Sequence, residues 1–426
     1  MENKYIEYKE KYTKTLLKTV SAYANFHDGE IFIGISDDGG IVGIENLDET
    51  MLAFENAIND SFDPRPFYEM EVLEKENKNV IRVKVYKGEN TPYLYNNKAY
   101  VRYNTADVVA DRLMLQMLTL DGSNMTYGKL KSKNENLEFG YFEKRFKSFY
   151  GINRYDKNFY ITLGLFDNGN YNNAAELLSD NNKHRINIIK FDGNSVMKIK
   201  DRRIFENMSV LEQFDECMNF FRRYSEVAED MSDVYRVTTR DVPEVAFREA
   251  LVNAIAHRNY LIDSAVQVEI YDNRIEIVSP GGLTFGIDEE AFKNGRISVC
   301  RNSLIVDALI RMKLVERMGT GIMKIKEQYK NRKVKPIFEV YDNLIKIILP
   351  KESVKLKEEV ARYNVDGEEY KVLRYIGENR LVSRKEIEIL LGKGKTAVTN
   401  VLNNMISKGT IVKVGEGRSS RYRVNE

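Results

Sequence analysis

Apolar residues recur at three- and four-residue steps between Pro243 and Tyr260, and a row of polar residues runs beside them. The apolar positions are Phe247, Ala250, Leu251, Ala254 and Ile255. This spacing predicts a helix with one buried face. Glu249, Asn253 and His257 stand four residues apart, so each falls about 40° further round the helix and the three form a ridge. A ridge of this kind is often a solvated stripe, but it can also present a carboxylate and an amide to one ligand.

A hairpin and two glycine turns follow this helix. Val266–Tyr271 and Arg274–Val278 alternate around Asp272-Asn273, which predicts two paired strands. The second strand leads into Ser279–Gly282 (SPGG), and Met318–Ile322 (MGTGI) later precedes an apolar-periodic segment. Backbone N–H groups at such a helix start could hold a phosphate. The order of helix, hairpin and glycine turns predicts a nucleotide site.

Segment 243–350 resembles the GHKL (Bergerat) ATP-binding domain, in the divergent version found in bacterial proteins labelled RecG-like. Those proteins share the ordered motifs REALVNAIAHR, RIEI, SPG, RN and GTGI, all of which occur here. The resemblance implies an α/β sandwich that binds ATP with Mg²⁺. By position, it makes Glu249 the water-activating base and Asn253 the Mg²⁺ partner.

The other positions of this resemblance concern the nucleotide itself. They are Gly281 and Gly282 for the adenine pocket, and Gly319, Thr320 and Gly321 for the phosphates. Ser279 and His257 also belong to the binding set, but each stands where typical GHKL enzymes carry an acidic residue. The acid replaced by Ser279 holds the adenine amino group in those enzymes. We therefore expect ATP binding with weak ATPase activity at most. No Walker motif occurs, so helicase activity is not expected.

The first 118 residues have the pattern of a mixed sheet with helices. The expected helices are Thr13–His27, Leu47–Asp60 and Asp107–Leu118, and the expected strands are Glu30–Ile35, Ile41–Ile44, Tyr68–Leu73, Val80–Tyr86 and Ala99–Tyr103. The stretch SAYANFHDGEIFIGISDDGGIVGI, which follows Glu7-Tyr8-Lys9, resembles the Schlafen/AlbA-type domain. Members of that family have an E-F-K start, and Tyr8 replaces its Phe. The resemblance covers roughly residues 1–118.

Such a domain has two functional alternatives. As a binding module for nucleic acid, RNA included, it would contact phosphates through basic residues. The candidates are Lys9, Lys11, Lys14, Lys18 and Arg102. As a nuclease it would need clustered carboxylates that hold a metal ion and activate water. The nuclease members of the Schlafen family place acids where this chain loosely matches with Glu2, Glu7, and Asp37 or Asp38. Turn chemistry explains the Asp-Asp-Gly-Gly sequence fully, and we favour the binding module.

Residues 119–209 carry no motif for chemistry and are expected to connect the two ends of the chain. Tyr160–Phe166, Ile186–Phe191 and Ser195–Ile199 are predicted strands. Val210–Tyr224 is a predicted amphipathic helix that opens the ATP-binding domain, which we place at residues 210–350. The charged segment 351–365 is the expected linker.

Residues 366–426 form a further unit. The expected helices lie around 370–376, 383–391 and 394–408, and the expected strands at 411–414 and 421–424. This pattern resembles the winged helix-turn-helix of many bacterial regulators. Between Arg380 and Arg423 there are ten basic and three acidic residues, a net charge of +7 against +1 for the whole chain. This local excess of positive charge indicates nucleic acid as the partner.

The third helix of this unit would enter the major groove of double-stranded DNA. The candidate contacts are Lys393, Lys395, Thr396, Thr399 and Asn400 near the helix start, and Arg418 and Arg421 on the wing. Winged helices also serve as protein docking units, so that alternative stays open.

Composition adds bounds on the class of protein. A chain of 426 residues with 43% apolar residues can hold two to four domains. Its two cysteines and three histidines have no metal-type spacing, which favours a reducing compartment and no structural zinc. The start of the chain is charged and no stretch approaches about eighteen apolar residues, so we expect a cytoplasmic protein without a membrane partner.

These observations predict an α+β multidomain protein, with a mixed-sheet Schlafen/AlbA-type domain, a GHKL-like α/β sandwich and a C-terminal winged helix-turn-helix. We expect a nucleotide-responsive DNA-binding protein, a homo-oligomeric transcriptional regulator that uses ATP and Mg²⁺. The alternative is a Schlafen-type metal-dependent nuclease, acting on RNA or DNA and gated by ATP. A third class, a subunit of a phage-defence or toxin-type assembly, is compatible with either function.

Overall fold

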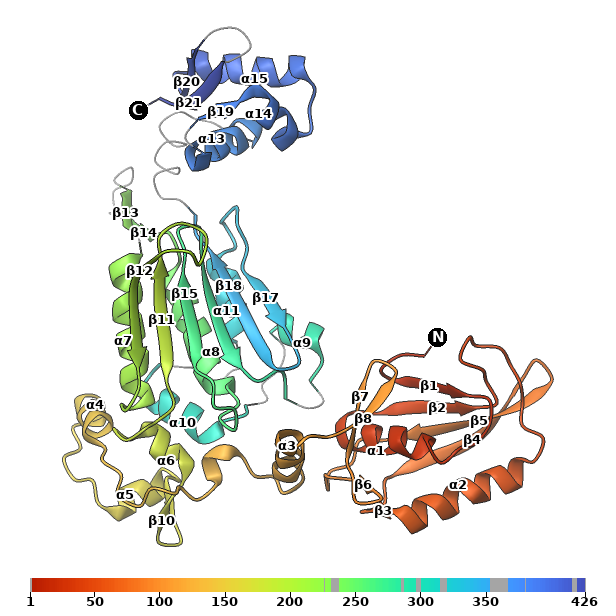
Figure 1. Ribbon diagram of the computed structural model, residues 1–426. Coiled ribbons are helices and arrows are strands. Elements are labelled where there is room, and N and C mark those ends of the chain that lie inside the picture. Colours follow the sequence, from red (N-terminus) through yellow and green to blue (C-terminus); the bar gives the residue numbers. More distant parts are fainter. Residues whose placement is uncertain are drawn as a thin grey trace.

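The computed structural model describes residues 2–225, 227–230, 237–284, 287–295, 300–314, 320–352, 367–379, 381–415 and 420–425. Figure 1 shows an N-terminal unit, a central body and a C-terminal unit, each with its own helices and sheet. The chain is therefore a multidomain α+β protein, as expected. Two predicted site residues, Gly319 and Arg418, and most of the expected linker lie outside the described residues. No helix among the described residues is long and apolar enough to cross a membrane.

The N-terminal unit is built on a four-stranded sheet. Its strands, in spatial order, are β1 (Ile6–Lys9), β2 (Gly29–Ile33), β5 (Lys78–Val85) and β4 (Tyr68–Lys75). β1 runs parallel to β2, and the other neighbours are antiparallel. Helices α1 (Leu16–Phe26) and α2 (Leu47–Ser61) share a core with this sheet, centred on Tyr23, Ile31 and Phe54. Both helices and the strands at 30–35, 68–73 and 80–86 match the prediction to within a few residues.

Two short strand pairs and a helix complete this region. β3 (Phe62–Asp63) pairs with β6 (Leu94–Tyr95), β7 (Tyr100–Tyr103) pairs with β8 (Ala106–Val109), and α3 (Arg112–Gly122) follows. The predicted helix 107–118 was wrong at its start, because the β7–β8 hairpin takes the first residues. The Asp111 carboxylate then accepts from the Met114 N–H and caps α3. The expected strand 41–44 is reduced to one bridge between Ile35 and Ile41.

The segment before the central sheet is mainly helical. It contains the 3-10 turn η1 (Tyr127–Lys129), α4 (Gly140–Tyr150), α5 (Lys157–Thr162), the pair β9 (Phe166–Asp167) and β10 (Asn170–Tyr171), and α6 (Asn173–Leu178). The strand predicted at 160–166 is wrong. The Asp156 carboxylate accepts from the Phe159 N–H and starts a helix there instead, and a short apolar run does not distinguish a strand from a helix.

A six-stranded sheet forms the centre of the body. Its order is β12 (Ile199–Phe205), β11 (Ile186–Phe191), β15 (Val266–Ile270), β16 (Arg274–Pro280), β18 (Leu344–Pro350) and β17 (Ile337–Val340). β11 is parallel to β15, while the other pairs are antiparallel. β11 and β12 precede residue 210, so strands from the segment expected to connect the domains lie in this sheet. The strand predicted at 195–199 is wrong, since β12 begins at Ile199.

The helices of the body share one core with this sheet. They are α7 (Val210–Tyr224), α8 (Glu244–His257), α9 (Glu289–Lys293), α10 (Ser303–Arg311) and α11 (Gly321–Gln328), and a strand pair β13 (Val227–Asp230) with β14 (Val237–Arg240) lies between α7 and α8 in the chain. Phe221 of α7 stacks on Phe247 of α8 with ring centroids 4.2 Å apart. This layer of helices fixes α8, which carries the Glu249, Asn253 and His257 ridge, against β16 (Figure 1).

The C-terminal unit has its own core and its own small sheet. Its elements are α13 (Gly367–Asn379), β19 (Val382–Ser383), α14 (Arg384–Leu391), α15 (Lys395–Ser407), β20 (Ile411–Val414) and β21 (Arg421–Val424). The sheet order is β19-β21-β20. Leu373, Ile387 and Leu402 meet in the core. Ser383 and Glu386 form a capping box at the start of α14. The helices and strands predicted for this unit are therefore present.

Candidate nucleotide site and nucleic-acid surfaces

The start of α11 packs directly against Asn253 of α8. A Cβ added to Gly321, the first residue of α11, would lie 2.8 Å from the Asn253 amide nitrogen and 3.0 Å from its oxygen. A side chain at this position would therefore have to displace the Asn253 amide. Thr320 precedes Gly321 as the N-cap residue of α11. Two of the three predicted phosphate residues thus lie beside the predicted Mg²⁺ partner.

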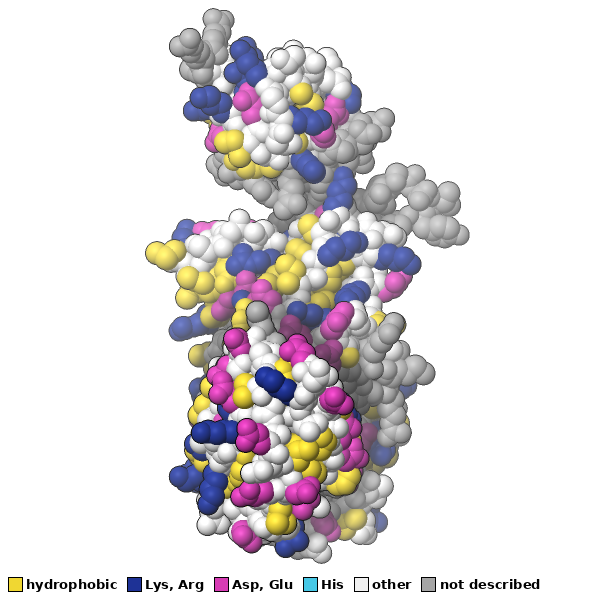
Figure 2. Space-filling view, turned by 90° about the vertical axis from the view of Figure 1, so that its right-hand side faces the viewer, with side chains coloured by type: hydrophobic (Ala, Val, Ile, Leu, Met, Phe, Trp, Pro, Cys, Tyr) yellow, Lys and Arg dark blue, Asp and Glu magenta, His cyan; other side chains and the backbone are white. Residues whose placement is uncertain are grey.

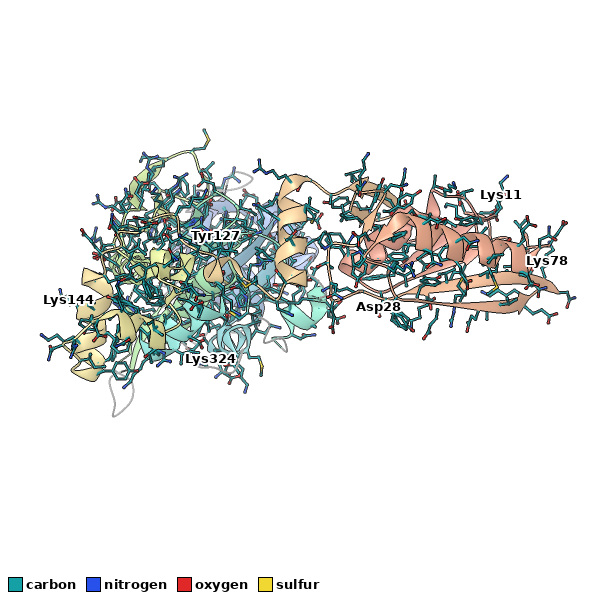
Figure 3. The ribbon with its side chains drawn as sticks, turned by 90° about the horizontal axis from the view of Figure 1, so that it is seen from below. Lys11, Asp28, Lys78, Tyr127, Lys144 and Lys324 are labelled. Carbon is teal, nitrogen blue, oxygen red and sulfur yellow. The ribbon has the colours of Figure 1, made fainter. Side chains whose placement is uncertain are left out.

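Glu249 lies one helical turn before Asn253. It is only 3% exposed, and its Oε1 accepts from Arg248 Nη2 at 2.9 Å. Lys324 of α11 places its Nζ 3.9 Å from the same oxygen. Lys324, which Figure 3 labels, was not among the predicted site residues, although its place three residues after Gly321 on one helix could have indicated it. The carboxylate, the amide and an ammonium group therefore meet where α8 crosses α11.

A second group of predicted residues lies at the C-terminal end of α8, about one turn beyond Asn253. The buried Ser279 hydroxyl donates to the Ala254 carbonyl at 2.8 Å. Gly281 has φ +96°, and a Cβ there would meet Asn259 Cβ at 2.5 Å. A Cβ on Gly282 would lie 2.4 Å from the Asp342 carbonyl oxygen in the β17–β18 turn. Both glycines are thus required by backbone geometry and by close contacts inside the protein.

Arg301 and Asn302 hold the C-terminal end of α8. The Arg301 guanidinium donates to the His257 carbonyl and to the Gly282 carbonyl, both at 2.9 Å. The buried Asn302 amide donates to the carbonyls of Ala256 at 2.9 Å and Arg258 at 2.8 Å. The carbonyls at a helix end have no partner within the helix, so these side chains satisfy them. The RN motif was noted in the sequence without a role.

His257 lies at this end of α8. Burial, with the nearby Arg301 guanidinium as a second cause, lowers the pKa of His257 to about 4. The imidazole is therefore neutral at pH 7, in a position where the resemblance expects an acid. Because a neutral ring adds no negative charge, it does not replace that acid as a Mg²⁺ or water ligand.

The contact with α11 and the C-terminal end of α8 differ in how well they suit ATP with Mg²⁺. At the α11 contact, the Asn253 amide oxygen is a hard ligand suited to Mg²⁺, and the helix start and the Lys324 ammonium suit phosphate. At the Gly281 end, the surfaces expected to line adenine are covered by Asn259, Arg301 and the β17–β18 turn. The phosphate end fits the ligand, whereas the base end does not.

The acids considered for a nuclease converge on one lysine. The Lys9 Nζ lies 2.8 Å from Glu7 Oε1, 3.2 Å from Glu2 Oε1 and 3.5 Å from Asp37 Oδ1. Asp38 is apart from this group and accepts from Ser36 Oγ at 2.5 Å within its own turn. Among the described residues, no cluster of three or more His, Cys, Asp or Glu side chains could hold a metal ion. An ammonium group thus occupies the centre that a metal would need.

Arg102 is also committed inside the N-terminal unit. Its side chain is 0% exposed and pairs with Glu7 and, at 3.2 Å, with Asp107. Burial raises the pKa of Glu7, although the two cations oppose this effect. Arg102 is therefore not available for the phosphate contact expected from the sequence, and Lys9 is held by the acids. Lys11 and Lys14 are exposed (Figure 3 labels Lys11 on this unit), and Lys18 is half-buried.

Comparison with known proteins matches two parts of the chain. Residues 2–111 match the family described as "Schlafen, AlbA_2", and residues 263–349 match "Putative ATP-dependent DNA helicase recG C-terminal". The chain carries an AlbA_2 domain and a RecG-type ATPase-like domain. Together they indicate a nucleic-acid-associated, ATP-binding protein. The second match includes Ser279, Gly281, Gly282 and the glycine turn before α11, and it begins after α8.

Whole-chain comparisons add little. A solved structure, the DIP2311 protein from Corynebacterium diphtheriae, is 17% identical, with 99% of this chain and 92% of that chain covered and a TM-score of 0.48. No curated protein matches this chain.

A cavity of about 250 Å³ lies between α3 and the ATPase-like domain. Met117 and Leu120 of α3 line it together with Tyr260 and Asn302, and Tyr127 of η1, which stacks on Tyr260, lines it as well. In Figure 3, α3 stands between the AlbA_2 domain and the body that carries Tyr127. This helix is therefore where the two matched domains meet.

Neither match reaches the C-terminal unit, where the predicted DNA contacts lie. Lys393, Lys395, Thr396 and Asn400 are exposed near the start of α15, and Arg421 is exposed on β21. Thr399 is half-buried and donates its hydroxyl to the Lys395 carbonyl. Lys393 pairs with Glu368 at 2.5 Å. Figure 2 shows basic side chains on this unit at the top of the view, with a few acidic ones among them, and both acidic and basic side chains on the AlbA_2 domain below.

Proposed function

We propose that this chain is a nucleotide-responsive DNA-binding protein that acts as a transcriptional regulator. The observation that carries the proposal is the C-terminal unit, where α14 and α15 follow each other closely and the β20–β21 hairpin comes next. That order is typical of a winged helix-turn-helix, whose second helix enters the major groove. The exposed start of α15 carries a lysine, a threonine and an amide, which are groups that bind phosphates and base edges.

The nucleotide part of the proposal rests on α8 and α11. Asn253 would be the Mg²⁺ ligand, and Glu249 would orient or deprotonate water if hydrolysis occurs. Mg²⁺ would neutralise phosphate charge when bound. Lys324 and the N–H groups at the start of α11 would bind the phosphates. Nucleotide binding would then change the DNA affinity of the C-terminal unit, which follows β18 in the chain.

Duplex binding by the full chain and by a chain ending at Val360 tests the DNA part. We expect truncation to remove most of the binding. Lys395→Ala should reduce the dependence of log K on log salt by about one unit, because one fewer counterion is released. Lys408→Ala is the matched control, since Lys408 lies at the other end of α15 and pairs with Glu369 at 2.8 Å. Equal duplex affinity of the truncated and full chains would make this unit a protein docking module.

A metal-dependent nuclease is the second candidate, because Glu2, Glu7 and Asp37 do lie within 3.5 Å of one point. The Lys9 ammonium would have to leave before a metal could bind there. Incubation with Mg²⁺ or Mn²⁺ and labelled RNA and DNA, with and without ATP, tests this candidate. Asp37→Asn is the better variant, since Asp37 is 78% exposed and Glu7 balances a buried arginine. Cleavage by the wild type that is lost in Asp37→Asn would support the nuclease alternative.

A further inference from the structure

The phosphate end of the candidate nucleotide site has the groups that an anion needs. The Asn253 amide lies where a side chain at Gly321 would begin, and α11 starts at that residue. Lys324, one turn into α11, is 27% exposed at its side chain. A helix start, an ammonium and an amide within one turn of each other can bind a polyphosphate with its metal ion. None of these groups recognises a base.

The base end is closed by a side chain of the protein itself. A Cβ on Gly281 would lie 2.8 Å from Arg301 Nη1, so the guanidinium lies directly on this turn. Arg301 donates two hydrogen bonds, to the carbonyls of His257 and Gly282. The family resemblance places the purine ring at this stretch of backbone. The Ser279 hydroxyl, in the position expected to meet the adenine amino group, is buried and donates to Ala254.

Arg301 closes this space with a charged group. No ion pair joins it to any carboxylate among the described residues, and it is half-buried. Burial lowers the pKa of Arg301 to about 10, so the group remains charged at pH 7. The two carbonyls that accept from Arg301 and the partial negative charge at the C-terminus of α8 favour a cation at this place. Asn302 caps the same helix end beside it with a neutral amide.

We infer that the ATPase-like domain binds the polyphosphate of a nucleoside triphosphate without selecting its base, and that Arg301 excludes the base from the Gly281–Gly282 turn. This inference rests on the proposed nucleotide binding and specifies its ligand class. Arg301 is a specificity residue in this scheme, because it acts by occupying the space rather than by contacting the phosphates.

Calorimetry on the full wild-type chain with Mg²⁺ and ATP, GTP or inorganic tripolyphosphate tests the inference without any variant. We expect the three dissociation constants to agree within about threefold. ATP binding at least about tenfold tighter than both others, which is about 1.4 kcal/mol, would mean that the base is read and would overturn the inference. Absence of heat with all three ligands would instead refute the nucleotide part of the proposed function, so the two failures are distinguishable.

Arg301→Ala tests the role of the side chain. This variant should gain at least about tenfold for ATP relative to tripolyphosphate, while the affinity for tripolyphosphate stays unchanged. Unchanged relative affinities would show that Arg301 does not exclude the base. Arg332→Ala is the matched control, because Arg332 also donates to two backbone carbonyls, those of Asp241 and Arg240, at 2.7 Å each. It should leave all three affinities unchanged.

Loss of the α8 cap could also unfold the domain, so thermal unfolding of each variant is measured alongside binding. Arg301→Lys provides the second variant. A lysine keeps the charge but lacks the planar fork that bridges two carbonyls. We expect a smaller gain for ATP than in Arg301→Ala. If Arg301→Ala and Arg301→Lys gave the same gain in ATP affinity, the two hydrogen bonds of the guanidinium would not be what excludes the base.

Discussion

Asn253 and Glu249 lie one turn apart on α8, but their surroundings assign them different roles. Asn253 is half-buried and lies against the start of α11, whereas Glu249 is buried beside Arg248. We expect Asn253→Ala to weaken nucleotide binding at least about tenfold, because a Mg²⁺ ligand is lost. Glu249→Gln should leave binding nearly unchanged and abolish any hydrolysis, because a general base acts on water. Calorimetry and a phosphate-release assay measure the two effects.

The control for this pair is Asn219→Ala, since Asn219 is an exposed amide on α7. It should change neither quantity. Equal loss of binding in Asn253→Ala and Glu249→Gln would assign both residues to the structure of the α8–α11 contact.

Two histidines predict how the free energy of unfolding of the ATPase-like domain changes with pH. Burial, followed by the Arg258 charge, lowers the pKa of His184 to about 4, and burial lowers that of His257 to about 4. Unfolded histidine titrates near pH 6.5. Between about pH 6.5 and 4 the unfolded chain therefore binds more protons, and the free energy of unfolding should fall as the pH falls through this range. Each unit of pKa difference corresponds to about 1.4 kcal/mol.

Chemical denaturation between pH 7 and pH 4.5 measures this slope. His184→Gln and His257→Gln should each make it shallower, whereas His27→Gln tests a histidine of the AlbA_2 domain whose pKa burial also lowers. An unfolding free energy of the wild type that rises on acidification would contradict the assignment of neutral, half-buried rings.

At the scale of elements, α15 carries three asparagines with different surroundings. Asn404 donates to Glu369 at 2.5 Å, which fixes it to α13. Asn400 and Asn403 are exposed on the same helix. An asparagine amide can bond to both N6 and N7 of adenine in the major groove. We therefore expect a selected binding site with A·T pairs at the positions that α15 reads, and Asn400→Ala should reduce the discrimination at one pair by about 1–3 kcal/mol.

Selection from a random duplex library, followed by competition with single-pair changes, measures that discrimination. Asn404→Ala is the control, because its loss should lower stability and leave the selected sequence unchanged. If wild type and Asn400→Ala selected the same site, α15 would not be the element that discriminates between base pairs.

Elements with strong periodicity and a local stop signal could be predicted from the sequence. The helix Val210–Tyr224 was predicted with both ends correct, because its amphipathic pattern is long and Ser209 caps it. Short apolar runs gave errors. Residues 157–162 form a helix because Asp156 caps its start, and residues 106–109 form a strand because they pair with β7. The spacing of apolar residues does not reveal either contact.

At the scale of the whole molecule, contacts between distant residues were beyond the sequence. The order of motifs placed Asn253 near the turn at Gly321, because the family resemblance supplied that pairing. Nothing in the spacing predicted that Arg301 would bond to His257 and Gly282, or that Lys9 would sit among the acids. The parallel pairing of β11 with β15 joins strands separated by α7 and α8, so the extent of the central sheet was hidden as well.

The last prediction concerns coupling between the two proposed binding sites. If a bound nucleotide changes the affinity for DNA by some factor, DNA must change the affinity for the nucleotide by the same factor, since both paths join the same end states. We expect a factor of at least about five, the lower end of typical couplings. Fluorescence anisotropy with duplex, with and without saturating Mg²⁺ and ATP, gives one factor, and calorimetry with and without duplex gives the other. Asn253→Ala should reduce the first effect at the same ATP concentration, because it lowers the occupancy of the nucleotide site and leaves the C-terminal unit intact. If each ligand binds and neither dissociation constant moves, the sites are independent, and the chain binds DNA without responding to nucleotide.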